Sequence, residues 1–256
     1  MLPEIHLGPV TLQSFGLMLG LAFIASGTLA QRFLVELRKP ADWAYEMVFA
    51  ALVGGLVGAR LWSVIEHWDT AKNDLLGSLF SGTGLVFYGG AIGGAIAVAL
   101  WAWWRGVFGP RMFDVAAPSL AIGYAVGRIG CQLAGDGDYG KAWNGPWAMA
   151  YPKGTVPTTE TVHPTPVYET LTMLLVTWFL WRMRHRVPAG ALFALWLLLA
   201  GGERFLVEFL RRNERVAAGL TVAQFISLAM VVGGVAWLAL LRNARTAHAP
   251  AAAART

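Results

Sequence analysis

The stretch WAYEMVFAALVGGLVGARLWSVI, residues 43–65, contains only two charged residues, Glu46 and Arg60. A helix needs about 20 mostly apolar residues to cross the hydrocarbon core of a bilayer. Six further stretches have this character, and they lie at residues 10–30, 84–104, 112–133, 166–181, 189–210 and 219–241. Because only helices satisfy their own backbone groups so many times in lipid without closing a barrel, the sequence predicts an all-α integral membrane protein of about seven transmembrane helices.

The composition supports this prediction. Hydrophobic residues make up 56% of the chain and charged residues 14%, whereas a soluble domain carries about 25% charged residues. The length of 256 residues suits one membrane domain, which we place at residues 1–243. The Ala-rich tail at 244–256 is predicted to be disordered in the cytoplasm. Residues 1–9 have neither Lys nor Arg and no small-residue cleavage pattern, so no signal peptide is predicted.

The distribution of Lys and Arg predicts that the N-terminus lies outside and the C-terminus inside. With this topology, eleven Lys and Arg residues fall in inner segments and six in outer segments. The long connection at 134–164 would then be an outer loop facing the periplasm, and the protein would lie in a bacterial inner membrane. The same scatter of basic residues among short loops explains the net charge of +5 without a nucleic-acid partner.

Three arginines, Arg60, Arg128 and Arg204, fall inside predicted spans. Each costs at least about 2.5–3.5 kcal/mol at the bilayer centre. It must therefore face the interior of the helix bundle, reach an interface or bind a partner. With the N-terminus outside, all three lie in the last third of helices that run outward, so they share the outer half of the membrane.

Other polar residues belong to the same layer. Tyr88 opens the third span, and His163, Tyr168 and Glu169 surround the start of the fifth. Four helices and one loop thus direct polar groups to one depth, which predicts a site. A channel or transporter is an alternative, but it would need polar residues through the full membrane depth. The inner halves of the spans are nearly free of them.

Arginine indicates phosphate as the ligand. Guanidinium groups stay charged and bind phosphate through two parallel hydrogen bonds, which suits an anionic phospholipid headgroup. Arg204 and Glu208 are four residues apart and share a helix face with Arg211. Glu208 could therefore orient Arg204 or act as a base.

The fourth span ends in a glycine-rich run, GRIGCQLAGDGDYG at residues 127–140. Its glycines allow a sharp exit and a close approach of the backbone to a ligand. Asp136 and Asp138 are a poor metal site because they supply only two carboxylates. The single cysteine, Cys131, excludes a multi-cysteine site. We therefore predict neither a metal nor a cofactor, and we interpret Cys131 as a small buried residue rather than a covalent nucleophile.

At these residues the chain resembles the bacterial prolipoprotein diacylglyceryl transferases, over about residues 5–241. The most specific segment is GRIG at 127–130 with the glycine-rich run after it. HPTPVYE at 163–169 is similar to the family's His-Pro-Ser-Gln-Leu-Tyr-Glu segment, and RFLVEFLR at 204–211 to its Arg-x-x-x-Glu-Phe-x-Arg segment. Further similar segments are GP at 8–9, SFGLM at 14–18, GAR at 58–60 and FYGGAIG at 87–93.

The resemblance implies a transferase that moves the diacylglyceryl group of phosphatidylglycerol to the lipobox cysteine thiol in a prolipoprotein signal peptide. A thioether forms and glycerol phosphate leaves. Arg128 and Arg204 would bind and polarise the phosphate, with Glu208 and Arg211 supporting Arg204. By the same resemblance, the residues that bind substrate or shape the peptide entrance are Arg60, Gly89, Gly90, Gly127, Gly130, Gly135, His163, Tyr168, Glu169 and Arg211.

The chain departs from the family on the side that activates the thiol. The typical member has His where this chain has Tyr88, and that His is the usual candidate for the base. A phenol has an ordinary pKa near 10, so a hydrogen bond to the phosphate is the role expected of Tyr88. Other family positions also differ, namely Phe15, Cys131, Ala134 and Asp136. The base is therefore Asp136, Glu208 or Tyr88.

A second interpretation is a relative that binds the same anionic lipid but passes it to another acceptor, or only binds it. We favour the transferase because the order of the motifs is intact. A thiol, with a pKa near 8.5, also needs less help from a base than a hydroxyl group would.

Overall fold

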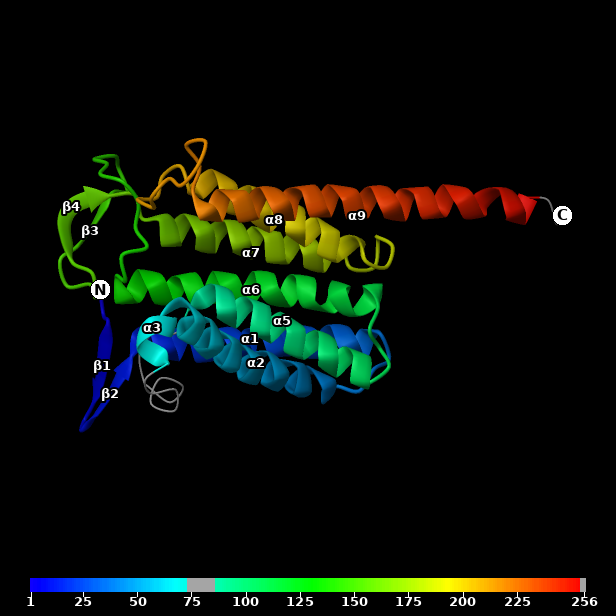
Figure 1. The fold of residues 1–256 in the computed structure, drawn as a ribbon, viewed down its shortest axis with the longest axis horizontal. Coiled ribbons are helices and arrows are strands. Elements are labelled where there is room, and N and C mark those ends of the chain that lie inside the picture. Colours follow the sequence, from blue (N-terminus) through cyan, green and yellow to red (C-terminus); the bar gives the residue numbers. More distant parts are fainter. Residues whose placement is uncertain (73–85, 254–256) are drawn as a thin grey trace. The chain divides into compact units, whose positions relative to one another are not determined.

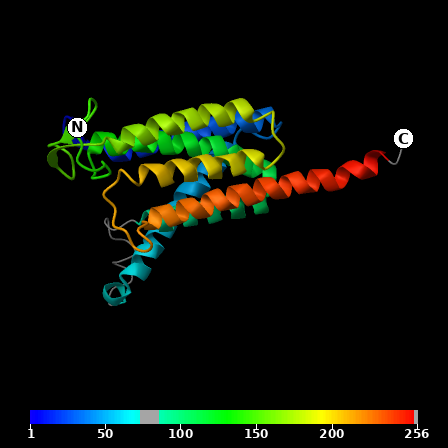
Figure 2. The same ribbon diagram turned by 90° about the horizontal axis from the view of Figure 1, so that it is seen from above.

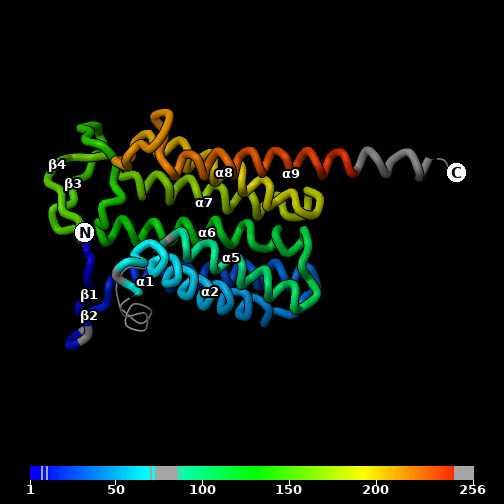
Figure 3. Tube along the Cα trace, in the orientation of Figure 1, coloured from blue at the N-terminus to red at the C-terminus, as the bar shows by residue number. Residues whose placement is uncertain are grey.

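The computed structural model describes residues 1–72 and 86–253, and Figure 3 follows their Cα path. The chain divides into two compact units. Unit 1 consists of Met1–Ala30 and Phe113–Thr256, and unit 2 consists of Gln31–Met112.

Seven helices of 17 residues or more make up most of the described chain (Figure 1). They are α1 (Ser14–Glu36), α2 (Trp43–Glu66), α5 (Phe87–Trp104), α6 (Pro110–Ala134), α7 (Thr165–Met183), α8 (Ala191–Val207) and α9 (Val222–Ala253). A short helix, α3, covers Trp68–Ala71. Each predicted span coincides with one long helix, which confirms the helical class. The first two residues of the span predicted at 84–104 lie outside the described residues, and the disordered tail stays a prediction.

The predicted start of the first span is wrong. Val10–Gln13 form strand β2, which pairs antiparallel with β1 (Glu4–Leu7), and the helix begins only at Ser14. Residues 10–13, VTLQ, are rich in β-branched and apolar side chains, so hydropathy alone does not separate this strand from the helix that follows.

Three helical segments are long and apolar enough to cross a membrane, judged by length and composition among the described residues. They are Ser14–Glu36, Trp43–Glu66 and Val222–Ala244. A fourth apolar segment, Tyr88–Trp104, is shorter. These helices establish the membrane character of the chain.

In unit 2, α2 and α5 pack through glycines. A Cβ atom on Gly93 would lie 2.3 Å from the carbonyl oxygen of Gly54, and one on Gly89 would lie 2.4 Å from that of Gly58. Small residues at these positions let the two backbones approach closely, as in many membrane helix pairs. The paired glycines of these helices therefore serve packing.

In unit 1, buried polar groups fix the ends of the helices. Asp114, near the start of α6, is fully buried and accepts hydrogen bonds from the backbone N–H groups of Gly190 (2.7 Å) and Phe193 (3.2 Å). These N–H groups at the start of α8 have no partner within the helix. Helices α8 and α9 then run side by side (Figures 1 and 2). A Cβ on Gly234 would lie 2.8 Å from the carbonyl oxygen of Ala194.

The predicted outer loop at 134–164 contains a second hairpin, which the sequence analysis did not predict. Strand β3 (Met149–Tyr151) pairs antiparallel with β4 (Thr158–Val162). The backbone N–H of Lys141 also donates to the carbonyl oxygen of Leu210 at 2.7 Å. This bond ties the loop to the chain just beyond α8, and so brings the residues before Lys141 close to those that follow Arg204.

Candidate functional site

The centre of the site is the carboxylate of Glu169, which is fully buried near the start of α7. It forms ion pairs with Arg128 Nε (3.0 Å), Arg204 Nη1 (3.0 Å) and Arg211 Nη1 (3.3 Å). The Tyr124 hydroxyl also donates to it at 3.1 Å. A buried carboxylate is stable only when its charge is paired and its lone pairs are satisfied. Here side chains of α6, of α8 and of the chain after α8 meet both requirements.

Helix periodicity explains how α6 contributes to this arrangement. Tyr124 and Arg128 are four residues apart on α6, so they share one face. Arg128 Nη2 donates to the Tyr124 hydroxyl at 3.1 Å, and the guanidinium lies 4.9 Å from the centre of the tyrosine ring. Tyr124 thus holds Arg128 and Glu169 together. The sequence analysis missed it, although its spacing from Arg128 was visible.

A second carboxylate, Asp138, lies in the loop after α6 and forms ion pairs with both Arg128 and Arg211. Burial alone would raise the pKa of this carboxyl, but the two guanidinium groups hold the pKa below its usual value. The backbone N–H of Asp138 donates to Asp136 Oδ1 at 3.2 Å. Gly137, between them, has a φ of +93°, a conformation that favours glycine.

The third carboxylate is Glu208, at the end of α8 and almost fully buried. Its Oε2 lies 2.9 Å from Arg204 Nη2. Its Oε1 accepts hydrogen bonds from Asn213 Nδ2 (2.7 Å) and Thr221 Oγ1 (2.8 Å). The two hydrogen bonds to Oε1 and the ion pair of Oε2 place Glu208 to fix the orientation of Arg204, although Oε2 is buried without a hydrogen-bond partner among the described residues.

We refer to Arg128, Arg204, Arg211, Asp138, Glu169 and Glu208 as the arginine cluster. Its three guanidinium groups and three carboxylates alternate, so each arginine contacts two acids. The side chains of Arg204 and Arg128 are 22% and 15% exposed, and that of Arg211 is 6% exposed. Arg204 and Arg128 therefore offer the N–H groups that a ligand can reach.

Two predicted residues lie at the edge of the cluster rather than in it. His163 Nδ1 shares a hydrogen bond with the Tyr168 hydroxyl at 3.3 Å, and Trp147 Nε1 donates to the same hydroxyl at 2.7 Å. The His163 ring stacks on Trp143, with centroids 4.4 Å apart. Burial lowers the pKa of His163, so its ring is neutral at neutral pH. These residues form an aromatic group on the loop at residues 134–164 and the start of α7.

Four predicted residues, Arg60, Tyr88, Gly89 and Gly90, belong to unit 2, on α2 and α5. Gly90 approaches α2 as Gly89 does, and a Cβ on it would lie 3.4 Å from the carbonyl oxygen of Gly55. The two glycines therefore have a structural role in helix packing. A part for any of these four residues in lipid binding stays a prediction.

The remaining predicted glycines differ from one another. A Cβ on Gly130 would lie 3.0 Å from the Cβ of Met18, so Gly130 serves packing against α1. Gly135 has a φ of +59°, and a Cβ on it would lie 2.8 Å from the Cα of Gly154. Gly127, by contrast, faces open space. Of these three glycines, only Gly127 has room for a side chain.

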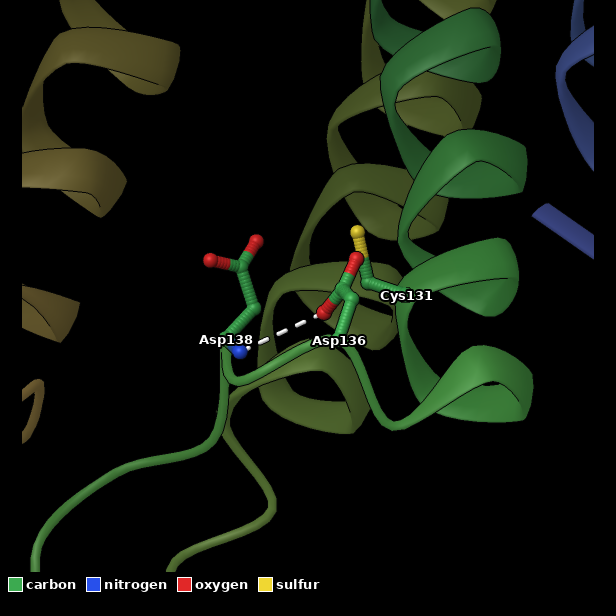
Figure 4. A group of neighbouring side chains, drawn as sticks. All are labelled: Cys131, Asp136 and Asp138. Atoms are coloured by element: carbon green, nitrogen blue, oxygen red, sulfur yellow. Dashed lines mark hydrogen bonds between the residues drawn. The ribbon is translucent and has the colours of Figure 1, made fainter. Parts of the chain in front are cut away.

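Cys131, Asp136 and Asp138 come together at the end of α6, with their side-chain donor atoms within 4.8 Å of one another (Figure 4). Two arginines already pair with Asp138, and their charge opposes the binding of a cation there. The thiol of Cys131 is buried, and its Sγ lies 3.8 Å from Arg128 Nη1. Burial raises the pKa of Asp136, which suits a group that exchanges a proton.

Helix spacing predicts that a further acidic residue, Glu203, points away from the face that Arg204 and Glu208 share. Glu203 precedes Arg204 on α8, and its Oε2 is buried without a hydrogen-bond partner in the part of the chain that the structure describes. It lies within electrostatic range of Glu169 and the three arginines. The signal was an acidic residue beside an intramembrane arginine, which is costly unless it has a function.

Comparison with known proteins gives a consistent result. Residues 4–240 match the family described as "Prolipoprotein diacylglyceryl transferase". A phosphatidylglycerol–prolipoprotein diacylglyceryl transferase of Clostridium tetani is 34% identical over 240 residues, which cover 89% of this chain and 95% of the relative. One from Methylococcus capsulatus is 34% identical over 261 residues, covering 95% and 96% of the two chains. One from Leptospira interrogans is 29% identical, covering 86% and 77%.

Proposed function

Because the chain belongs to the prolipoprotein diacylglyceryl transferase family, we propose that it transfers the diacylglyceryl group of phosphatidylglycerol to the lipobox cysteine of prolipoprotein signal peptides. It is a transferase of lipoprotein maturation. The observation that carries the proposal at the level of residues is the arginine cluster, in which Arg128 and Arg204 are partly exposed.

The setting of the reaction is a bacterial inner membrane, crossed about seven times with the N-terminus outside and the C-terminus inside. The seven long helices support this number of crossings, and the excess of Lys and Arg in the inner segments supports the orientation. The arginine cluster then lies near the outer headgroups, where it meets the phosphate of a lipid from the outer leaflet.

The cluster suits a reaction in which a phosphate leaves. The thiolate sulfur bonds to the carbon of the diacylglyceryl group that carries the phosphate. The bond between this carbon and the phosphate oxygen breaks, and its electron pair departs with glycerol phosphate. Arg128 and Arg204 donate hydrogen bonds to the phosphate oxygens as negative charge builds up on them. Arg211 and the carboxylates hold both guanidinium groups in position.

The thiol proton needs an acceptor. Glu208 is a poor candidate because its Oε1 accepts two hydrogen bonds and its Oε2 is ion-paired with Arg204, and Tyr88 is expected to hydrogen-bond to the phosphate instead. Asp136 is the best of the predicted candidates, since its pKa is raised by burial. Asp136→Asn should then lower the rate of transfer while phosphatidylglycerol still binds. An unchanged rate in this variant would exclude Asp136 as the base.

The experiment that tests the function uses purified protein, phosphatidylglycerol and a synthetic lipobox peptide, with mass spectrometry of the peptide. We expect a diacylglyceryl mass increase on the cysteine peptide and none on a matched serine peptide. Arg128→Ala and Arg204→Ala should each abolish transfer, whereas Lys153→Ala, on the exposed turn after β3, should not. Full activity in either arginine variant would contradict the role of the cluster.

A further inference from the structure

A basic pocket of about 90 Å³ lies beside the arginine cluster, within unit 1. Its wall comes from Lys141 on the outer loop, from the end of α8 with the connection after it, and from the start of α9. The residues that line it are Lys141, Glu208, Phe209, Arg211, Arg212, Asn213, Arg215, Thr221 and Gln224. Four of them are cations and one is a carboxylate, so the pocket favours an anion.

The contacts around the pocket hold its cations in place. Lys141 Nζ donates to the carbonyl oxygen of Phe209 at 2.8 Å. Arg212 Nε donates to the carbonyl oxygen of Gly140 at 2.9 Å, and its Nη2 lies 3.0 Å from the exposed Glu160. Lys141, Arg212 and Arg215 are all exposed. The pocket therefore opens to water, and Lys141 and Arg212 are held in place before any ligand arrives.

Two residues belong to both the pocket and the arginine cluster. Arg211 pairs with Asp138 and Glu169 on the cluster side, and Glu208 pairs with Arg204. Both also line the pocket. The pocket and the arginine cluster are therefore adjacent, since they share Arg211 and Glu208.

The proposed reaction changes the charge of its phosphate group. In phosphatidylglycerol the phosphate is a diester with one negative charge. The released glycerol phosphate is a monoester, which carries about −1.5 to −2 at pH 7 because its second pKa is near 6. A more basic site attracts the monoester more strongly than the diester. The charge gained in the reaction therefore favours movement from the cluster to the pocket.

We propose that this pocket binds the phosphate monoester product, glycerol phosphate, on its way from the arginine cluster to water. The inference rests on the proposed function, because that function supplies the monoester. Arg215 and Arg212 bind the phosphate, and Lys141 adds its charge. The monoester group of a membrane lipid such as phosphatidic acid has the same chemistry, so the test must separate the two sources.

The test measures equilibrium binding of glycerol phosphate to the purified full-length protein by isothermal titration calorimetry at pH 7.5. We expect Arg215→Gln to raise the Kd about five- to tenfold, the effect of losing one charge-assisted contact, and Arg215→Glu to raise it further. Lys153→Gln removes the same charge from the outer loop outside the pocket and should leave the Kd unchanged. The melting temperature of each variant verifies folding.

A second arm titrates phosphatidic acid in nanodiscs, and its affinity should be the same for the native protein and Arg215→Gln. The proposal would be overturned if Arg215→Gln raised the Kd for phosphatidic acid but not the Kd for glycerol phosphate. It would also be overturned by equal Kd values of Arg215→Gln and Lys153→Gln for glycerol phosphate, or by no binding of glycerol phosphate at all. Peptide mass spectrometry on the same preparations keeps the two ideas apart. Normal transfer without glycerol phosphate binding rejects the pocket alone, whereas absence of transfer rejects the proposed function.

Discussion

Glu169 has a different position from the one its motif suggested. The resemblance implied a wall of the peptide entrance, but the carboxylate is buried among three guanidinium groups. The sequence could indicate which arginines were unusual, because each is costly in an apolar span. It could not indicate which carboxylate would balance them, since that depends on how α6, α7 and α8 pack. Asp138 was likewise considered only as a weak metal ligand.

Glu169→Gln should destabilise the protein by about 3–5 kcal/mol, because it leaves buried arginines without their common partner. Denaturant unfolding in detergent micelles measures the change. Glu160→Gln is the matched control: this carboxylate is 65% exposed and pairs with Arg212, so the loss should stay below about 1 kcal/mol. Equal losses in the two variants would show that Glu169 is not the centre of the network.

Asp138 should make the free energy of unfolding depend on pH in the acidic range. Its folded pKa lies below the usual value because of Arg128 and Arg211, so its contribution is present above the unfolded pKa of about 3.9. That contribution is lost as the pH falls through the folded pKa. The difference in melting temperature between the native protein and Asp138→Asn should therefore stay constant from pH 6 to about pH 4 and shrink as the pH falls below the unfolded pKa of about 3.9. A difference that does not change with pH would argue against the two ion pairs.

At the scale of elements, the long helices were predictable because each carries a long apolar run. The hairpins were not, because strands of three to five residues are too short for a clear alternation. The glycines of α2 and α5 serve packing between the two helices, whereas the resemblance implied a substrate-binding role for Gly89 and Gly90. Tyr124, Glu203 and the pocket after α8 depend on tertiary neighbours, and the sequence offered only their spacing.

The contact of α2 with α5 gives a prediction about packing. Gly93→Ala should destabilise the protein by about 1–3 kcal/mol, because the new Cβ would lie 2.3 Å from a backbone oxygen of Gly54 and the helices must move apart. Gly16→Ala on α1, where the Cβ meets open space, should be neutral. Thermal unfolding of both variants in the same detergent makes the comparison. A stable Gly93→Ala protein would exclude close packing of these helices.

At the scale of the whole molecule, the orientation can be tested with single cysteines in a Cys131→Ser background. A cysteine in place of Lys153 should react with a membrane-impermeant maleimide in cells whose outer membrane is permeable and whose inner membrane is intact. A cysteine at Arg186, in a connection predicted to be inner, should react only after the inner membrane is opened. The reverse pattern would place the arginine cluster near the cytoplasmic leaflet and contradict the proposed topology.

The alternation of three arginines with three carboxylates has a consequence for how lipid binds. Because the charges of the cluster already cancel, it can lie in a membrane without a ligand. An arriving phosphate then takes the place of a carboxylate of the cluster as the partner of an arginine, so one anion is exchanged for another. The affinity is then the small difference between two large interaction energies. Under the proposed function we therefore expect each lipid molecule to bind weakly, which suits an enzyme whose substrate is also part of the surrounding membrane.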